Sequence, residues 1–260
     1  MFEFSEEQIA RLLAGIYNGT LLPYNLPESL YFAIADYLKR GLYKGFGGGL
    51  SDFAVGSKDF ELLSELRENV YMFSGAKTYQ QVKVMSDFMS EGGRVPTVKE
   101  FDEHAMKVFD RYNKVWGHTE HQTCIGQGQC AVKWNKIVND AAVLPLLQYS
   151  AVGGETTCPI CGALDGMIRP VSDPIWRTKA PLNHFGCLCL LLQLHDGEVT
   201  NKADADRIST QVDREMQDIF KMNPGIDKVV FSDQHPYFSV QPKDRLLAMR
   251  NFDLPIPKKD

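Results

Sequence analysis

The chain has 260 residues, of which 44% are hydrophobic and 23% are charged, a mixture typical of a globular protein rather than a disordered tail or a small disulfide scaffold. Lys and Arg number 28 and Asp and Glu number 33, so the formal net charge is -5. This balance excludes a protein that coats nucleic acid with its whole surface, although local DNA contacts stay possible.

The N-terminus and the uncharged stretches argue against export and membrane insertion. The first residues, MFEFSEEQIARLL, carry acidic side chains where a secretory signal carries Lys or Arg. The uncharged stretches at 141–154 and 180–194 are shorter than the ~20 apolar residues of a membrane-spanning helix. We therefore expect a protein without a membrane partner, made in the cytoplasm, where cysteines stay reduced.

The segment 1–95 is predicted to be an N-terminal helical region. Ser5 and Gln8 form a capping box ahead of a helical repeat of Ile and Leu, and Asn18-Gly19 ends this helix. Pro27 then opens a second amphipathic helix. This second helix is expected over 30–42, and two further helices are expected over 59–73 and 79–89.

A longer helical pattern opens the middle region, 96–194. Thr97 and Glu100 form a second capping box, and apolar residues continue at helical spacing to Val138, with a break expected near Gly126 or Gly128. Strands are expected over 146–152 and 188–194. A small β unit is therefore predicted to bracket four of the six cysteines.

The C-terminal extension, 195–260, is predicted to contain a helix over 204–220 and a short strand over 229–231. Prolines alternate with apolar side chains over 223–260. Because proline resists helix formation and apolar side chains need burial, we expect an extended arm that packs on this chain or on a partner. The alternative is a disordered C-terminus, since chain ends are commonly mobile.

Closely spaced cysteines and one histidine have the pattern of a zinc site. Cys158 and Cys161 form a Cys-x2-Cys pair, and a later motif supplies His184, Cys187 and Cys189. Two ligand pairs separated by a loop suit tetrahedral zinc, because each tight turn points two ligands at one ion. Cys158, Cys161, His184 and Cys187 already supply four ligands, so Cys189 is a fifth candidate. We expect a structural zinc ion here.

The second motif also predicts which side chains face the core. Cys187 and Cys189 are two apart on a predicted strand, so their thiols should share one face. The opposite face then carries the leucines, which we expect to be buried in a core. These are Leu188, Leu190 and Leu192.

Three alternatives to structural zinc stay open. The cysteines can be buried thiols without a metal. Cys158 and Cys161 can be a redox pair of the thioredoxin-like kind, but this needs a helix after the first thiol, and Gly162 and the turn Asp165-Gly166 make a helix unexpected. A catalytic zinc needs an open coordination position and a general base, and the only near acids are Asp165 and Asp173.

Other polar motifs are weaker. His118, His121 and Cys124 lie near one helical stripe, but their spacing matches no zinc-protease pattern, so we expect ordinary polar residues and a small buried cysteine. Cys130 is also expected to be a buried hydrophobe. No Gly-x-Ser-x-Gly or comparable nucleophile motif is present in the sequence.

Several motifs follow one another in a characteristic order between Thr97 and Leu194. They are Trp116-x3-Glu120, Trp134, Gln148-Tyr149, Cys158-x2-Cys161-x2-Leu164-Asp165-Gly166, Asp173-Pro174-Ile175-Trp176, Pro181 and His184-x2-Cys187-x-Cys189. In order and spacing they resemble the phage Mu F-like head morphogenesis family of minor head proteins. The family's usual ending is His-x2-Cys-Arg-Cys, and Leu188 stands here in place of the arginine, so a contact made by that arginine in relatives is missing.

The resemblance implies a structural or assembly protein of the virion rather than an enzyme. Its expected place is the capsid interior near the portal after synthesis in the host cytoplasm, with the portal protein, other head proteins and double-stranded DNA as partners in head morphogenesis or DNA packaging and delivery. The alternatives are a zinc-stabilised DNA-binding accessory protein and a thiol redox or zinc enzyme. The predicted fold is α+β, mostly helical, with a small zinc-clamped β unit and an extended C-terminal arm.

Overall fold

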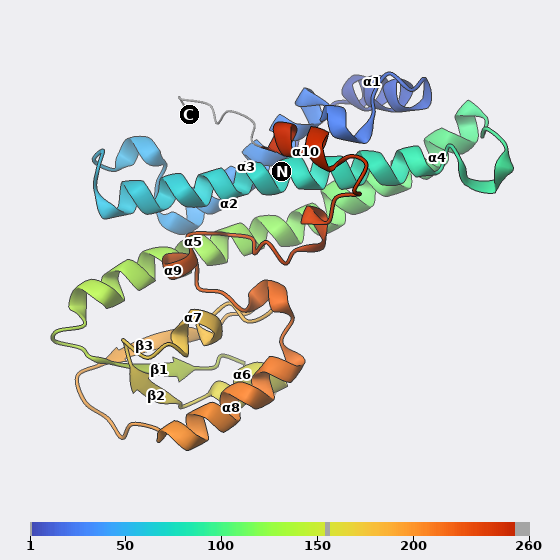
Figure 1. The fold of residues 1–260 in the computed structure, drawn as a ribbon. Helices are drawn as coiled ribbons and strands as arrows, with labels where there is room; N and C mark the ends of the chain where they lie inside the picture. Colours follow the sequence, from blue (N-terminus) through green and yellow to red (C-terminus); the bar gives the residue numbers. More distant parts are fainter. Residues whose placement is uncertain (1, 154–156, 253–260) are drawn as a thin grey trace. The chain divides into compact units, whose positions relative to one another are not determined.

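A computed structural model describes residues 2–153 and 157–252 (Figure 1). The described chain is mostly helical and carries one three-stranded sheet, which confirms the predicted α+β class. Its contacts divide it into two units, each built from segments that are distant in sequence. The helical unit comprises Met1–Gly41, Arg67–Gln122 and His235–Asp260, and the sheet unit comprises Leu42–Leu66 and Thr123–Gln234.

Both predicted capping boxes begin helices in the helical unit. Helix α1, Glu6–Tyr17, starts after Ser5, whose hydroxyl accepts the backbone N–H of Gln8. Helix α4, Val98–Asp110, starts after Thr97, and the Glu100 carboxylate accepts the Thr97 N–H at 2.8 Å. Each box satisfies backbone donors that a helix start otherwise leaves unpaired, so the local sequence fixes both starts.

Two predicted helices are one helix in the structure. Helix α2 spans Glu28–Phe46, and α3 continues without interruption over Lys58–Asp87. The expected gap falls at Ser74 and Thr78, which are fully buried. Their hydroxyls donate to backbone carbonyls one turn earlier, at 2.7 and 2.8 Å. These bonds satisfy the polar side chains inside the helix, so burial outweighs their weak helix propensity.

The expected break near Gly126 or Gly128 is not where the helix changes. The segment η4, Arg111–Trp116, is π-helical, and α5 then runs over Gly117–Asp140. In the sheet unit, a Cβ on Gly128 would lie 2.8 Å from the Leu42 carbonyl oxygen. This glycine therefore permits close helix packing instead of interrupting the helix.

A buried ion pair holds the helical unit together. Lys77 of α3 pairs with Glu120 of α5, and only 1% and 6% of their side chains are exposed. Lys77 also donates to the Tyr112 carbonyl oxygen at 2.7 Å, and the Tyr237 hydroxyl donates to Glu120 at 3.1 Å. Burial raises the pKa of Glu120, while Lys77 and Tyr237 oppose that rise. One network thus joins two helices, the π-helical segment and the C-terminal segment.

The substitution Lys77→Met should destabilise the protein by about 3–5 kcal/mol, because it leaves the Glu120 carboxylate buried without its cation. The double variant Lys77→Met/Glu120→Gln should recover part of this loss, since the amide carries no charge and can still accept from Tyr237. Urea unfolding of the three proteins measures both effects. Equal stability of wild type and Lys77→Met would show that the pair contributes nothing.

The C-terminal segment contains more helix than the sequence predicts. Helix α9, Pro224–Asp227, 3₁₀ turn η7, Pro236–Phe238, and α10, Arg245–Phe252, lie in it. The first two begin at a proline, which is tolerated at a first helical position because no N–H is needed there. Residues 229–231 are described and form no strand, although Val230 and Phe231 are buried. The strand predicted over 229–231 was therefore wrong, and the C-terminal arm is less extended than predicted.

The predicted arm nevertheless packs on this chain over its described part. In the helical unit, the rings of Tyr237 and Phe238 contact the ring of Phe73, with centroids 5.3 and 6.1 Å away. The Gln80 side chain donates to the backbone carbonyl oxygens of Tyr237 and Ser239. The remaining arm residues, 253–260, lie outside the described residues.

The sheet unit is built on three antiparallel strands in the order β2-β1-β3. Strand β1 spans Leu146–Ser150 and β3 spans Leu190–Leu194, both shorter than predicted. Strand β2, Ile168–Pro170, was not predicted, because three residues are too few to show an alternating pattern. The helices beside the sheet in Figure 1 are α6, Pro159–Leu164, α7, Trp176–Lys179, and α8, Lys202–Glu215.

One face of this sheet forms the core of the sheet unit. Leu147 and Tyr149 of β1 and Leu191 of β3 are buried there with Trp176 of α7 and Val212 of α8. The cysteines before β3 are buried on the same side, as predicted. The leucines that alternate with them are instead exposed, so placing them in a core was wrong. Their exposed fractions are 72% for Leu188, 47% for Leu190 and 42% for Leu192.

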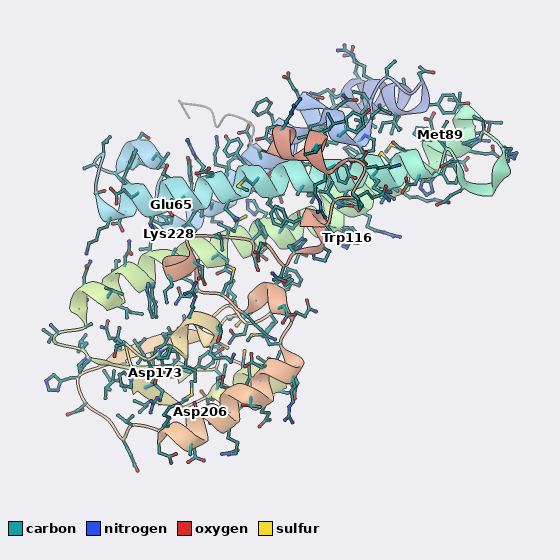
Figure 2. All side chains as sticks on the ribbon, in the orientation of Figure 1. Glu65, Met89, Trp116, Asp173, Asp206 and Lys228 are labelled. Atoms are coloured by element: carbon teal, nitrogen blue, oxygen red, sulfur yellow. The ribbon has the colours of Figure 1, made fainter. Side chains whose placement is uncertain are left out.

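Polar contacts fasten the helices around the sheet. Lys179 of α7 is buried and pairs with Asp213 of α8 at 2.7 Å. The buried Asn223 side chain donates to the Trp176 carbonyl oxygen at 3.0 Å. Lys228, after α9, pairs with Glu65 of α3 at 2.7 Å within the same unit (Figure 2). Both partners of the last pair are about half-exposed, so we expect it to contribute little to stability.

Candidate metal centre

The five side chains that the sequence singles out as ligands come together in the sheet unit. The ligand atoms of Cys158, Cys161 and His184 lie within 4.8 Å of one another, and so do those of Cys161, Cys187 and Cys189. Cys161 belongs to both groups, so the five residues form one cluster around its sulfur. We call it the cysteine cluster.

The first pair is positioned by the start of α6. Cys158 is the N-cap, and its sulfur accepts the backbone N–H of Cys161 at 3.3 Å. Pro159 suits the first helical position, and Gly166, with φ 75°, turns the chain after this short helix. The prediction that no helix follows Cys158 was therefore wrong, because six residues suffice for a helical turn before Asp165. The argument against a redox pair loses its basis.

His184 is held so that one ring nitrogen faces the cluster. Its Nδ1 lies 2.8 Å from the Phe185 carbonyl oxygen, which can only accept, so Nδ1 carries the proton. Nε2 is then unprotonated in the neutral ring, and it lies 3.4 Å from the Cys161 sulfur. A histidine that donates through one nitrogen and presents the other as a lone pair has the usual arrangement of a metal ligand.

The charges in the cluster are unevenly shared. The sulfurs of Cys161 and Cys187 lie 3.8 Å apart, and the hydrogen bond between them lowers the pKa of Cys187 to about 5. The same bond, together with burial, raises the pKa of Cys161, and burial raises that of Cys189. Removing the proton from one of these thiols therefore makes it harder to remove the proton from the other. A bound cation would favour the loss of both protons, because metal ligation requires thiolates.

A second layer of residues supports Cys161, and sequence reasoning missed its role. The fully buried Tyr149 donates its hydroxyl to the Cys161 sulfur at 3.3 Å. Asn183, also fully buried, donates its amide to the Tyr149 oxygen at 3.0 Å and to the Lys179 carbonyl oxygen at 3.5 Å. Burial raises the pKa of Tyr149, so the phenol keeps the proton that it donates. Only the place of Tyr149 in the Gln148-Tyr149 motif hinted at this.

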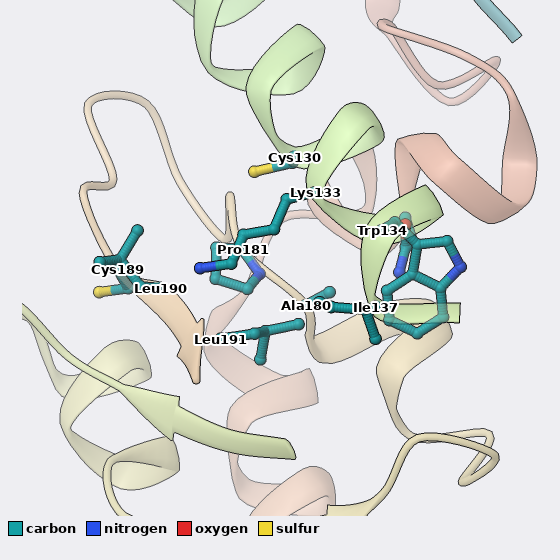
Figure 3. Close-up of a pocket in the computed structure, with 10 residues that line it drawn as sticks. Cys130, Lys133, Trp134, Ile137, Ala180, Pro181, Cys189, Leu190 and Leu191 are labelled. Carbon is teal, nitrogen blue, oxygen red and sulfur yellow. The ribbon is translucent and has the colours of Figure 1, made fainter. Parts of the chain in front are cut away.

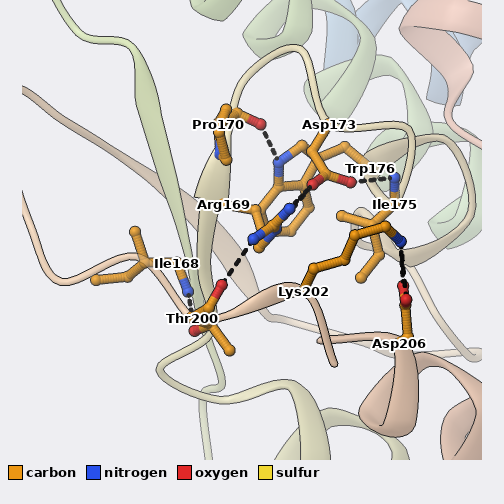
Figure 4. A network of polar contacts seen from close by, with 9 residues as sticks. All are labelled: Ile168, Arg169, Pro170, Asp173, Ile175, Trp176, Thr200, Lys202 and Asp206. Atoms are coloured by element: carbon orange, nitrogen blue, oxygen red, sulfur yellow. Dashed lines mark hydrogen bonds and ion pairs between the residues drawn. The ribbon is translucent and has the colours of Figure 1, made fainter. Parts of the chain in front are cut away.

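The two acids considered for a catalytic zinc site have other partners. Asp165 accepts the backbone N–H of Ala151 at 2.8 Å. Asp173 accepts from the Arg169 guanidinium at 2.7 Å and from the Ile175 N–H at 2.9 Å (Figure 4). Both carboxylates therefore shape loops around the cluster.

The weaker candidate residues do not join the cysteine cluster. Within 2–153 and 157–252, no group of three ligand atoms includes His118, His121 or Cys124. His121 stacks on Tyr37 with ring centroids 4.5 Å apart, and Cys124 is fully buried.

Cys130 lines a small cavity beside the cluster. The cavity has a volume of about 30 Å³, and Lys133 and Cys189 also line it (Figure 3). Burial raises the pKa of Cys130 to about 12, as suits a small buried hydrophobe. A space of this size holds about one water molecule and no organic substrate.

The comparison with known proteins bears on the same segment. Residues 75–192 match the family model described as Phage Mu protein F like protein. The resemblance is confirmed. Neither a curated protein nor a solved structure matches the chain. The match covers less than half of the chain, and it shows that this segment is similar to a family named for a phage Mu protein. Among the described residues, no helix combines the length and hydropathy needed to cross a bilayer.

If the cysteine cluster binds zinc, the substitution Tyr149→Phe should weaken that binding by about 10–100-fold, because it removes an outer hydrogen bond to the Cys161 sulfur while keeping the ring in the core. Competition with a chromophoric chelator measures the affinity. Tyr79→Phe is the matched control, since it removes a buried hydroxyl that donates to Asp244 in the helical unit. Equal affinities of Tyr149→Phe and wild type would contradict the role given to Tyr149.

Proposed function

We propose that this chain is a minor head protein that lies near the portal of a phage virion and acts in head morphogenesis or in DNA packaging and delivery. The observation that carries this proposal is the family match over 75–192, which contains all five residues of the cysteine cluster. The proposal assigns no catalytic activity, because the two acids near the cluster bind backbone and arginine groups instead of a reacting centre.

We also propose that the cysteine cluster binds one structural zinc ion. Tetrahedral zinc places two sulfur ligands about 3.8 Å apart and a sulfur and a nitrogen about 3.5 Å apart, given Zn–S of about 2.3 Å and Zn–N of about 2.0 Å. The sulfurs of Cys161 and Cys187 are 3.8 Å apart, and Cys161 Sγ and His184 Nε2 are 3.4 Å apart. Both separations therefore fit. Such an ion would tie α6 and the loop before β3 together.

The proposed partners are the portal protein and other head proteins, with double-stranded DNA as a further candidate. The net charge of -5 favours protein partners over extensive phosphate contacts. A zinc-stabilised DNA-binding accessory protein is the alternative. Salt-dependent DNA binding by the purified chain would support that alternative, because phosphate contacts weaken steeply as salt rises.

Mass spectrometry of purified procapsids and mature virions tests the head-protein proposal. We expect the chain in both particles, in low copy number, and in complexes that are pulled down with the portal protein. A major capsid protein and a non-virion phage protein from the same infected cells serve as positive and negative controls. Absence from both particles and from portal complexes would contradict the proposal.

Metal removal should separate structural zinc from the redox alternative. The reduced, purified chain should contain about one zinc ion, and chelation should lower its unfolding midpoint, because structural zinc binding is coupled to folding. Metal analysis and thermal unfolding check this. Full stability without metal, together with a reversible Cys158–Cys161 disulfide on mild oxidation, would instead support a redox pair.

A further inference from the structure

The cysteine cluster offers five donors, whereas a structural zinc ion takes four. On the basis of the zinc site proposed above, we infer that the ligands are Cys158, Cys161, His184 and Cys187 and that Cys189 stays outside as a free, buried thiol. The sequence leaves this choice open, because Cys187 and Cys189 are two residues apart and both thiols are buried.

Cys161 is the ligand that every arrangement of the cluster needs. Its sulfur is the only atom that belongs to both groups of neighbouring donors among the described residues. It lies 3.4 Å from His184 Nε2 and 3.8 Å from Cys187 Sγ, and both distances match the separation of two ligands on a tetrahedral zinc ion. The Tyr149 hydroxyl also points to it, as an outer-layer donor points to a ligating thiolate.

Cys158 and His184 are assigned as ligands because of the way their donor atoms are held. The Cys158 sulfur accepts the N–H of Cys161 at 3.3 Å, which fixes this sulfur beside the cluster. His184 is fixed through Nδ1 by the Phe185 carbonyl oxygen, which directs Nε2 to the cluster. In a site with four cysteine ligands, the lone pair of His184 Nε2 would face a zinc-bound sulfur and would bind neither a proton nor the metal.

The choice between Cys187 and Cys189 rests on what their sulfurs contact. The Cys187 sulfur lies 3.8 Å from the shared Cys161 sulfur, which is the separation of two sulfur ligands on tetrahedral zinc. The Cys189 sulfur lies within 4.8 Å of both of these sulfurs. Cys189 also lines the small cavity that it shares with Cys130 (Figure 3). Cys189 therefore lies on the side of the cluster that faces this cavity, and we assign Cys187 as the fourth ligand.

Zinc content, zinc affinity and the cobalt(II) spectrum of the full chain test this ligand set. The variants are Cys189→Ser, Cys187→Ser and His184→Cys, with Cys130→Ser and His195→Ala as matched controls. Cys130 is the neighbouring thiol, and His195 is an exposed histidine of the same unit. The sulfur-to-cobalt absorption reports the number of thiolate ligands, a readout that a change in stability alone does not move.

We expect one zinc ion and three thiolate ligands in wild type, and the same in Cys189→Ser and both controls. Cys187→Ser should lose more affinity than the about 100-fold that follows loss of an outer-layer partner. His184→Cys should keep the metal and gain a fourth thiolate. Because the last variant and Cys189→Ser retain the ion, the test stands even if Cys187→Ser fails to fold.

Two results would overturn the assignment. Loss of zinc from Cys189→Ser, with zinc retained in Cys130→Ser, would make Cys189 a ligand. Four thiolates in wild type would exclude His184. Absence of metal from reduced wild-type protein would overturn the zinc proposal itself, and this is seen before any variant is made. It leaves the head-protein proposal intact, since that depends on the virion experiment.

Discussion

The sheet unit depends on how the sulfur of Cys161 is surrounded. Three short strands bury little apolar surface, so the unit needs further contacts between its loops and its sheet. The Cys161 sulfur supplies a common point for α6, β1 and the loop before β3, because Cys161 lies in α6 and its sulfur contacts Tyr149 and His184. Segments far apart in the sequence are thereby fixed around one atom. A metal ion at that atom would strengthen contacts that the chain already makes.

In the helical unit, a buried ion pair joins segments that are far apart in the sequence. Lys77 and Glu120 are buried with opposite signs, and each has a further hydrogen-bond partner, Tyr112 or Tyr237. The extra bonds matter because taking two ions out of water costs several kcal/mol per ion, which the pair alone does not reliably offset. Glu120 also belongs to the Trp116-x3-Glu120 motif of the family resemblance, so this motif residue has a structural task.

Features determined by neighbours in sequence could be predicted. The caps at Ser5 and Thr97 start helices because their partners lie three residues away. The five candidate ligands that the cysteine spacing singled out lie in two groups that share Cys161. The unbroken α3 could not be foreseen, because the burial of Ser74 and Thr78 depends on distant helices. The same is true of Gly128, whose contact with Leu42 in the sheet unit is long-range.

The exposed leucines show how the strand register decides which neighbouring residues are covered. Side chains alternate between the two faces of an extended segment, so residues 187 to 192 cannot all face inward. Sequence hydropathy favours burying the leucines, but the register pairs Leu191 with the buried Tyr149, so Leu191 faces the core. Cys187 and Cys189, at the same two-residue spacing, take the covered face too. Once that face is occupied, Leu188, Leu190 and Leu192 must point outward, whatever their hydropathy.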